Sequence, residues 1–487
     1  MTLANNNSTS DKQKGWLIFA GVILFNFVLK ALFAGSNQLA LDEPFTVFYS
    51  QQPLSEIFKM LGQENNPPLH FIFLHFWIKL FGISEISVRM PSIIFSSVAA
   101  GIIFLIGKRY ISLISGLLAA ILFTFSTLNI YFAHEARVYA LFTMLSALSL
   151  YYYLRLVTED QSISARAALV IVNVLALYSH YLGALIIIAQ ILLFFIMPGP
   201  VRKKVLRPLI AVTAFTVLFY VPNIYIFISR LSLYNVSSSW LNQPEFAGLY
   251  DNIMKYSNAP VVAVTFITLI VAAFIAFLVK RKNEKISAAA RILAVHFIIL
   301  YVGIFLISFR FPSFWDRYLS FVFPSFYLLI ALSISYLFRR GALQWMLPAL
   351  LTLLMTASVN INRSNRNDTR VIAELIKSYP VSSRKVVIYP SWTEKGIVYY
   401  YNREYFKNWN SFNTSLQNDN IFAQDIPDEI MKIASQDTLT LIYIQTGTNK
   451  GTPEDSPYNR LKRHYSNCTD RDEFGGFYVS IFSGNKK

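Results

Sequence analysis

The sequence predicts a polytopic α-helical membrane protein with a small soluble α/β domain at its C-terminal end. Apolar stretches of about 20 residues, the length that spans a bilayer, recur through the first 360 residues. Of the 487 residues, 54% are hydrophobic and only 14% are charged, whereas a soluble domain carries roughly 25% charge. From about residue 361 shorter segments rich in β-branched and aromatic residues follow. We therefore expect a transmembrane domain over 1–360 and an extracytoplasmic α/β domain over 361–487.

Eleven segments are long and apolar enough to be membrane spans. The apolar stretch over 165–197 is too long for one crossing, so we divide it at Ser179 and His180. The predicted spans are 16–35, 84–107, 112–131, 136–155, 165–180, 181–197, 205–226, 261–279, 292–309, 318–337 and 342–360.

The segment NPPLHFIFLHFWIKLFG (66–82) is also apolar, but it is short and contains His70, His75 and Lys79. We interpret it as an amphipathic helix that lies at the membrane surface. If it does not cross, the basic clusters between the spans all fall on the cytoplasmic side with the N-terminus, as the positive-inside rule requires. Counting it as a span would place every cluster outside. The two histidines are five residues apart and do not share a helix face, which argues against a joint metal site.

The net charge of +16 does not indicate a nucleic-acid partner, because the Lys and Arg residues stand mostly in short clusters between apolar blocks. That distribution is typical of cytoplasmic loops. Cys468 is the only cysteine, so an intramolecular disulfide and a cysteine-rich metal site are both excluded.

The tail after residue 361 reads as a mixed domain on the outer side of the membrane. Residues 384–389, 438–445 and 474–482 have the composition of β-strands. Asp368 is expected to cap a helix that runs through Ser378.

With this topology the distinctive polar residues gather at the outer face. Carboxylates, histidines and arginines collected at one membrane interface indicate a functional site that faces an amphipathic substrate. These residues are Asp42, Glu43, His70, His134, Glu135, Arg137, Tyr139, His180, Arg317 and Tyr318.

Five motifs, in this order and spacing, carry a family resemblance. They are LDEPFTVFY (41–49), NNPPLHFIFLHFWIKLFG (65–82), SEISVRMPS (84–92), HEARVYAL (134–141) and DRYLSFVFP (316–324). Together they resemble the bacterial membrane glycosyltransferases of the GT-C superfamily, family 39-like, which include protein O-mannosyltransferase and aminoarabinose-transferase relatives. Relatives often have His before the Pro-Pro pair, and this chain has Asn66 there.

The resemblance implies a GT-C-like fold with interfacial helices in the first outer loop. It implies an inverting glycosyltransferase that moves a hexose or pentose from a polyprenyl-phosphate donor. The acceptor is a lipid, a glycan or a protein, and the reaction takes place among membrane lipids at the outer face of the inner (plasma) membrane. No cofactor is predicted with certainty, and the participation of a divalent metal is left open.

Asp42 occupies the acidic position that the family uses, so the resemblance makes it the catalytic base. Its neighbour Glu43 is able to exchange roles with it or bind a metal. The alternative is that both residues only cap a helix of the loop.

Arg317, Tyr318 and Arg137 are the candidates for binding the donor phosphate, because a guanidinium matches phosphate oxygens. The alternatives are an Arg317 that snorkels to lipid headgroups, and an Arg137 that pairs with Glu135 or Asp42. The candidates for substrate binding share polar side chains near the same face, and the alternative for the histidines is a satisfied polar group between helices. These candidates are Glu135, Tyr139, His180 and His70.

Two other classes of function compete with the enzyme. A transporter or flippase of lipid-linked glycan intermediates would show repeated halves, broken helices and ionisable residues at the midplane. The sequence has no paired Gly/Pro-interrupted segments, and its ionisable residues favour one face. A non-catalytic scaffold would need no acidic residues in the first outer loop.

Overall fold

The computed structural model describes residues 9–159, 161–233, 241–280, 287–361, 368–435, 440–446 and 453–486. The chain divides into two compact units, and neither is continuous in sequence. The first consists of Met1–Ala34, Phe58–His70 and Arg89–Arg363. The second consists of Gly35–Ile57, Phe71–Val88 and Ser364–Lys487. The tail thus forms a unit together with two stretches of the predicted domain 1–360.

The first unit is a bundle of helices. Its long helices are apolar along most of their length, which lets backbone hydrogen bonds be satisfied within each segment in a bilayer. The helices of this unit, long and short, are α1 (Thr9–Ala31), α5 (Glu85–Tyr110), α6 (Leu113–Thr124), α7 (Thr127–Ala133), α8 (Tyr139–Thr158), α9 (Ile163–Ser179), α10 (Gly183–Phe195), α11 (Gly199–Leu233), α12 (Ala247–Tyr256), α13 (Pro260–Lys280), α14 (Ala288–Ile307), α15 (Asp316–Leu319), α16 (Phe323–Leu337) and α17 (Leu343–Ser358).

Each predicted span contains helical residues of this bundle, but 112–131 falls on two helices, α6 and α7, and 318–337 on α15 and α16. Within the described residues, six helices are long and apolar enough to cross a membrane, namely α1, α5, α8, α11, α13 and α14. The helices α6 and α7 pass the same test only as a pair, bent by 65° at the break between them. The helices α9, α10, α16 and α17 are apolar but shorter than 18 residues. A multi-pass membrane protein follows from this, and the number of eleven crossings stays a prediction.

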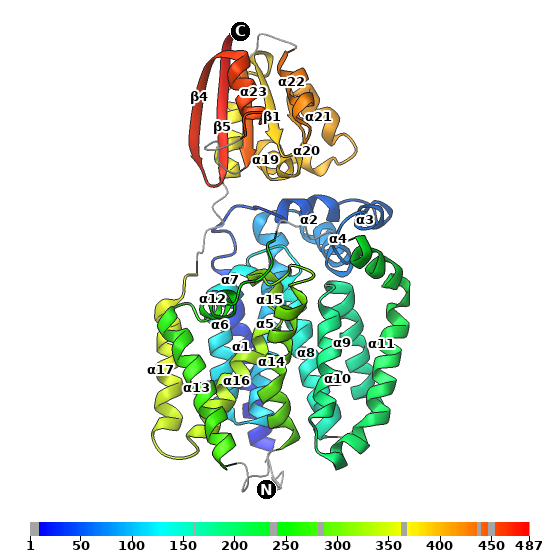
Figure 1. Cartoon of the computed structure of the whole chain (residues 1–487), viewed down its shortest axis with the longest axis vertical. Helices are drawn as coiled ribbons and strands as arrows, with labels where there is room; N and C mark the ends of the chain where they lie inside the picture. The colour runs from blue at the N-terminus through cyan, green and yellow to red at the C-terminus, as the bar shows by residue number, and fades with distance from the viewer. Residues whose placement is uncertain are drawn as a thin grey trace. The chain divides into compact units, whose positions relative to one another are not determined.

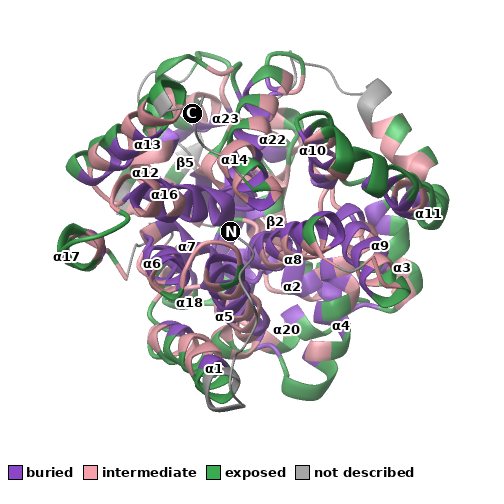
Figure 2. Cartoon of the chain, turned by 90° about the horizontal axis from the view of Figure 1, so that it is seen from below, coloured by how far each residue is buried: buried purple, intermediate pink, exposed green. Residues whose placement is uncertain are grey.

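Burial within the bundle is graded from its middle to its rim. Figure 2 shows α8 and α16 mostly buried, whereas α1, α11 and α17 carry much exposed surface. Many of the exposed side chains of α11 and α13 are apolar, for example Phe215, Leu218, Phe274 and Leu278. A rim of exposed apolar side chains on long helices is the surface expected to face lipid.

Two features fix how neighbouring helices pack. Gly107 of α5 and Gly116 of α6 face each other so closely that a Cβ on Gly107 would lie 2.5 Å from the Cα of Gly116. Small residues of this kind let helix backbones approach in membranes. Between α8, α9 and α10, the side chains of Ser149, Asn173 and Gln190 form a closed hydrogen-bonded group with separations of 2.7–3.0 Å.

Three of the predicted basic clusters meet at one end of the bundle. Glu159, which follows α8, lies 2.5 Å from the Arg109 guanidinium and 3.5 Å from that of Arg155. The backbone oxygen of Glu159 accepts a hydrogen bond from Lys204 at 3.3 Å. These residues therefore share one side, as the positive-inside argument expects.

The second unit contains a five-stranded sheet and short helices. The strands are β1 (Arg384–Tyr389), β2 (Ile421–Ala423), β3 (Thr440–Thr446), β4 (Tyr465–Phe474) and β5 (Phe477–Lys486). The helices of the tail are α18 (Thr369–Lys377), η2 (Val381–Ser383), η3 (Ser391–Thr393), α19 (Glu394–Tyr401), α20 (Arg403–Lys407), α21 (Phe412–Asn418), α22 (Pro427–Ser435) and α23 (Pro457–His464). The first outer loop adds α2 (Glu43–Ser50) and contributes to α3 (Leu54–Leu61) and α4 (Leu69–Phe81).

The strand order is β2-β1-β3-β5-β4. The strands β2, β1 and β3 are parallel, with Val386 opposite Ile421 and Val387 opposite Tyr443, and β5 and β4 are antiparallel (Figure 1). The helices α22 and α23 share a buried apolar cluster with β1, β3 and β5. Both β1 and β3 are buried along nearly their whole length, as parallel strands usually are.

The predicted strand at 384–389 is confirmed as β1. The strand predicted at 438–445 is β3, which begins at Thr440, and residues 438–439 lie outside the described residues. The strand predicted at 474–482 begins three residues later at Phe477, because Gly475 and Gly476 have positive φ and make the turn from β4. The strands β2 and β4 were not expected.

Two predicted helices also formed. The segment predicted over 66–82 is α4, whose exposed side chains include Phe73, Phe76, Leu80 and Phe81, while His70 and His75 are both buried. An exposed apolar side suits a helix at a membrane surface, and that location stays a prediction. Asp368 precedes α18 as expected, but its side chain makes no capping hydrogen bond.

Candidate functional site

The two predicted carboxylates stand at the start of α2 in the second unit. Asp42 is half-buried and takes the N-cap position, but its side chain makes no capping hydrogen bond. Its backbone oxygen accepts from the Thr46 amide at 3.1 Å. The alternative in which the Asp42 carboxylate serves as the cap is therefore not what the structure shows.

Glu43 has a different environment from its neighbour. Only 2% of its surface is exposed, and its Oε2 accepts a hydrogen bond from the Ala40 amide at 3.3 Å. This carboxylate thus satisfies a backbone amide of the turn before α2, which is a structural task. Of the two acids, Asp42 is the more accessible to a substrate.

The helix α2 packs against α19 of the tail. A Cβ on Gly396 would lie 3.5 Å from Pro44, so the two helices approach closely there. The Lys395 ammonium lies 5.4 Å from the ring of Phe48 and 5.7 Å from that of Tyr49, and it pairs with Glu394 at 2.9 Å. No pattern in the sequence linked these tail residues to the acidic loop.

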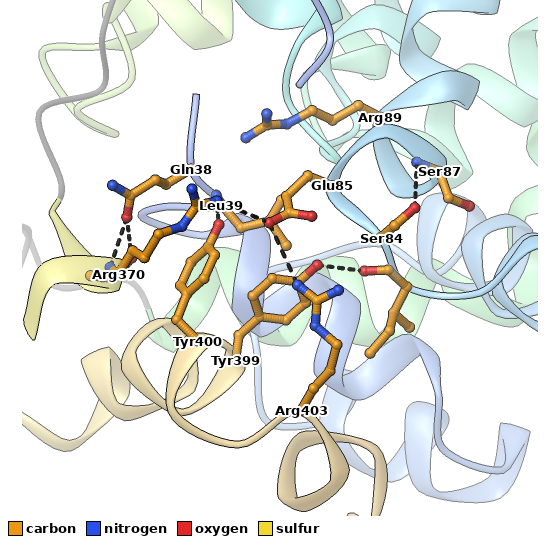
Figure 3. Close-up of polar contacts among 12 residues, drawn as sticks. Gln38, Leu39, Ser84, Glu85, Ser87, Arg89, Arg370, Tyr399, Tyr400 and Arg403 are labelled. Carbon is orange, nitrogen blue, oxygen red and sulfur yellow. Dashed lines mark hydrogen bonds and ion pairs between the residues drawn. The ribbon is translucent and has the colours of Figure 1, made fainter. Parts of the chain in front are cut away.

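The backbone before Asp42 is also bound to the tail (Figure 3). The Leu39 amide donates to the Tyr400 hydroxyl at 2.7 Å, and the Gln38 side-chain oxygen accepts from the Arg370 amide at 2.8 Å. Gln38 therefore supplies the cap of α18 that was expected from Asp368.

In the first unit, four predicted residues lie in one cluster. The rings of Tyr139 and Tyr318 are 6.4 Å apart, and those of Tyr318 and His180 are 5.6 Å apart. The Arg137 guanidinium lies 6.0 Å from the Tyr139 ring. The sequence thus predicted a group of residues that the fold brings together from α8, the α9–α10 turn and α15.

Hydrogen bonds define the orientation of two members of this cluster. The Leu182 amide donates to Nδ1 of His180 at 3.1 Å, so the neutral ring carries its proton on Nε2. The His180 ring stacks on Phe142 at 5.0 Å with an interplanar angle of 12°. Arg137 donates to the Asn66 side-chain oxygen at 3.5 Å. The residue that departs from the family pattern therefore contacts a predicted phosphate-binding residue.

His70 of α4 contacts the segment before α8 that contains Arg137. Its Nε2–H donates to the Ala136 carbonyl at 3.2 Å, and its Nδ1 is buried with no hydrogen-bond partner among the described residues. The pKa of His70 is lowered to about 4, mainly by burial and to a smaller extent by the Arg137 charge, against the opposing effect of the Ala136 hydrogen bond. The ring is therefore neutral at pH 7, and its Nδ1 is a hydrogen-bond acceptor.

The remaining predicted residues are placed less directly. The Glu135 carbonyl accepts from the Ser92 hydroxyl at 2.6 Å, so its backbone is tied to α5. Arg317 is half-buried beside Tyr318 on α15, and its backbone amide donates a hydrogen bond to Asp316 Oδ1 at 2.8 Å. The role of Arg317 in binding the donor phosphate stays a prediction. No group of three or more metal-ligating side chains forms among the described residues.

Two comparisons of the sequence with known proteins gave one match to a family. Residues 65–226 match the family described as dolichyl-phosphate-mannose-protein mannosyltransferase. No curated protein matches the chain significantly in sequence.

Three solved structures share the fold. ArnT from Cupriavidus metallidurans bound to undecaprenyl phosphate is similar with a TM-score of 0.57 at 12% identity, over 96% of this chain and 98% of that chain. The oligosaccharyltransferase of Archaeoglobus fulgidus with zinc and sulfate is similar with a TM-score of 0.52 at 11% identity, over 94% of this chain and 72% of that chain. AglB of Archaeoglobus fulgidus with an inhibitory peptide and a dolichol-phosphate gives 0.51 at 11% identity, over 96% and 74%. The resemblance stated from the five sequence motifs is thereby confirmed.

Proposed function

Because this chain has the fold of the GT-C superfamily membrane glycosyltransferases, we propose that it transfers a sugar from a polyprenyl-phosphate donor to an acceptor. The transfer inverts the sugar carbon and takes place at the outer face of the inner membrane. The sugar is a hexose or pentose, and the acceptor is a lipid, a glycan or a protein. The observation that carries the proposal is the cluster of Arg137, Tyr139, His180 and Tyr318, three of whose members lie inside the matched family segment.

The cluster has the chemistry that a lipid-phosphate leaving group needs. Negative charge develops on the phosphate as the sugar departs, and a guanidinium fixed nearby stabilises it. Arg137, held between Asn66 and Tyr139, is the best-positioned cation of the described residues, and we assign Arg317 and Tyr318 to the same task. ArnT, which has this fold, binds undecaprenyl phosphate, and that supports a donor of this class.

The sugar and the acceptor require neutral hydrogen-bonding groups and a base, in place of the cation that the phosphate requires. The Nδ1 of His70 accepts a hydroxyl hydrogen, while the Nε2–H of His180 donates one. Tyr139 and Glu135 complete the substrate-binding set. Asp42 acts as the general base on the acceptor, because it is half-buried, whereas Glu43 is buried and accepts a hydrogen bond from the Ala40 amide.

One observation favours the alternative of a transporter or flippase for lipid-linked intermediates. The 65° bend between α6 and α7 is a broken helix of the kind that transporters use at substrate sites. The described residues contain only this one bent pair, however, and transporters have such segments in corresponding positions of two halves.

The test is to incubate the purified protein with a panel of polyprenyl-phosphate sugars and to follow the release of polyprenyl phosphate. A transferase releases it, and a flippase moves the intact lipid-linked sugar across a vesicle bilayer without release. Translocation in the absence of release with every donor and acceptor tested would replace the proposal by the alternative.

The base assignment has its own test in the Asp42→Asn variant. This change keeps the size and hydrogen bonding of the side chain but removes its charge, and we expect turnover to fall by roughly 10²–10⁴. Glu43→Gln keeps the hydrogen bond to Ala40 and is expected to cost less. Transfer rates are compared at matched expression and thermal stability. An Asp42→Asn protein with wild-type turnover would contradict the assignment, and a dead Glu43→Gln protein would exchange the two roles.

A further inference from the structure

The backbone that leads into Asp42 is held by the last third of the chain. Gln38, four residues before Asp42, accepts hydrogen bonds from the Arg370 amide at 2.8 Å and the Thr369 hydroxyl at 3.3 Å. These donors begin α18, so the first outer loop completes the N-terminus of a tail helix. The same two hydrogen bonds fix the position of the Gln38 side chain.

The next residue makes a second bond to the tail. The Leu39 amide donates to the Tyr400 hydroxyl of α19 at 2.7 Å, and Leu39 itself is fully buried. Only Ala40 and Leu41 separate this bond from Asp42. Leu41 has a φ of +52°, a conformation that L-residues other than Gly and Asn rarely adopt unless their surroundings impose it.

A third contact holds the chain on the C-terminal side of the two acidic residues. Just after Asp42 and Glu43, Pro44 packs against Gly396 of α19. Tyr400 lies one helical turn further along the same helix, so α19 touches the chain on both sides of Asp42. The carboxylate is therefore carried on a short segment with both ends fixed to one tail helix.

The second stretch of the outer loop is bound as well (Figure 3). Glu85 Oε1 lies 3.5 Å from both the Arg370 and the Arg403 guanidinium, and the Tyr399 hydroxyl donates to the Ile83 carbonyl at 2.7 Å. The ion pairs are partly exposed and stabilise little individually. Together with the buried Tyr399 bond, they attach both sides of the loop to α18, α19 and the start of α20.

We propose that the tail domain positions the catalytic acid, with Tyr400 as the positioning residue that fixes the backbone before Asp42. This rests on the proposed function, in which Asp42 is the base. Tyr400 does not touch the reacting atoms. Its hydroxyl holds Leu39, and the conformation of Leu39 to Leu41 determines where the Asp42 carboxylate points. Small misplacements of a catalytic group are costly, about a hundredfold for 1 Å.

The test uses Tyr400→Phe in the full-length protein, with Tyr401→Phe as its matched control. The Tyr401 hydroxyl donates to Asp419 Oδ2 at 2.8 Å and accepts from the Arg384 guanidinium at 2.8 Å, so its hydrogen bonds stay within the tail. Two quantities are measured: kcat and KM for the donor, and hydrogen exchange of the peptide that contains the Leu39 amide. Both variants are assayed at a temperature where their unfolding curves show them fully folded.

We expect Tyr400→Phe to speed exchange at Leu39 and to lower kcat about tenfold, with the donor KM unchanged. Tyr401→Phe should leave both the exchange at Leu39 and kcat at wild-type values. Faster exchange with an unchanged kcat, in a protein whose Asp42→Asn variant is inactive, would overturn the positioning role and leave the proposed function intact. Unchanged exchange at Leu39 would also overturn it. Full turnover of Asp42→Asn would remove the base assignment, and the positioning role with it.

Discussion

At the scale of single residues, Arg317 and Tyr318 show how neighbours on a helix take different roles. Successive residues on a helix point about 100° apart, and it is Tyr318 whose ring meets Tyr139 and His180. Arg317, the preceding residue of the same short helix, is half-buried. Its proposed role is to bind the donor phosphate.

We predict that Arg317→Ala weakens use of the lipid-phosphate donor by roughly ten- to a hundredfold while the fold persists, because it removes a charge-assisted contact worth about 1.5–3 kcal/mol. Arg317→Lys should rescue only in part, since an ammonium lacks the guanidinium fork. The measurement is donor KM and kcat. Arg310→Ala is the control, because Arg310 is exposed on the same loop and stacks on Phe311. Full activity of Arg317→Ala rules out the role.

His70 leads to a prediction about pH. Its pKa is lowered to about 4 in the folded protein, mainly by burial, whereas an unfolded histidine titrates near 6.5. Between these values the unfolded chain binds the extra proton, so the free energy of unfolding decreases as the pH falls from about 6.5 to about 4. The slope for one such group approaches about 1.4 kcal/mol per pH unit.

The variant His70→Asn keeps a donor for the Ala136 carbonyl but cannot titrate. We expect its melting temperature to fall less than that of the wild type between pH 7 and pH 5, measured by tryptophan fluorescence in detergent. His134, whose pKa burial also lowers to about 4, remains in both proteins and serves as a common background. Equal losses in the two proteins would show that His70 does not contribute.

The sequence predicted four residues that the fold brings together, but it did not predict the contacts that hold the acidic loop. A polar residue at the end of an apolar span stands out, which is how Arg137, Tyr139, His180 and Tyr318 were found. Nothing local distinguishes Asp42 from Glu43, because their difference is one of burial. Gln38 and Tyr400 were missed, since their roles arise from pairing between distant segments.

At the scale of helices, the contact between α5 and α6 depends on two glycines. A Cβ on Gly116 would lie 2.5 Å from the Phe104 carbonyl oxygen and 2.6 Å from the Lys108 nitrogen. These are backbone atoms of α5, so they cannot rotate away. The two helices must separate to accept any side chain at this point.

We predict that Gly116→Ala destabilises the protein by about 1–3 kcal/mol, as overpacking of a tight contact does. Gly21→Ala is the matched control, because Gly21 lies in α1 with nothing within 4 Å of its added Cβ. That change should be neutral or stabilising by about 0.5–1 kcal/mol, since Ala favours the helix. Melting temperatures in one detergent compare the two. Equal effects would mean that the close approach of α5 and α6 is not needed.

Helices were easier to predict than strands for a physical reason. A membrane span is recognised in a sequence by about 20 consecutive apolar residues, and each of the predicted segments contains a helix. The strand β2 has only three residues, and β4 (YSNCTDRDEF) is polar because it forms an edge of the sheet. Neither carries the alternating apolar pattern on which a prediction depends.

At the scale of the whole molecule, orientation in the membrane follows from charge. Arg109, Arg155 and Lys204 gather around Glu159 at the end of α8, and Arg137 and Tyr139 stand at the helix's other end. A helix of 20 residues is about 30 Å long, the thickness of the hydrocarbon core. Basic loops favour the cytoplasm, so the cluster with Arg137 is expected at the outer face.

We predict that a reporter fused to the C-terminus, of a kind active only in the cytoplasm, is silent. The same reporter placed after Arg340, in the predicted cytoplasmic loop between α16 and α17, should be active and is the control. An active C-terminal fusion would mean that 66–82 crosses the membrane or that one predicted span does not.

The hydrogen bond between Leu39 and Tyr400 joins residues 361 positions apart, so it can form only after most of the chain has been synthesised. During translation the acidic loop emerges early, yet the residues that hold it are synthesised only after all the membrane helices. In a nascent chain the segment that carries Asp42, the proposed base, therefore lacks its contacts with the tail. We expect transfer activity to begin only once the tail has folded, and chains that end before it to be inactive.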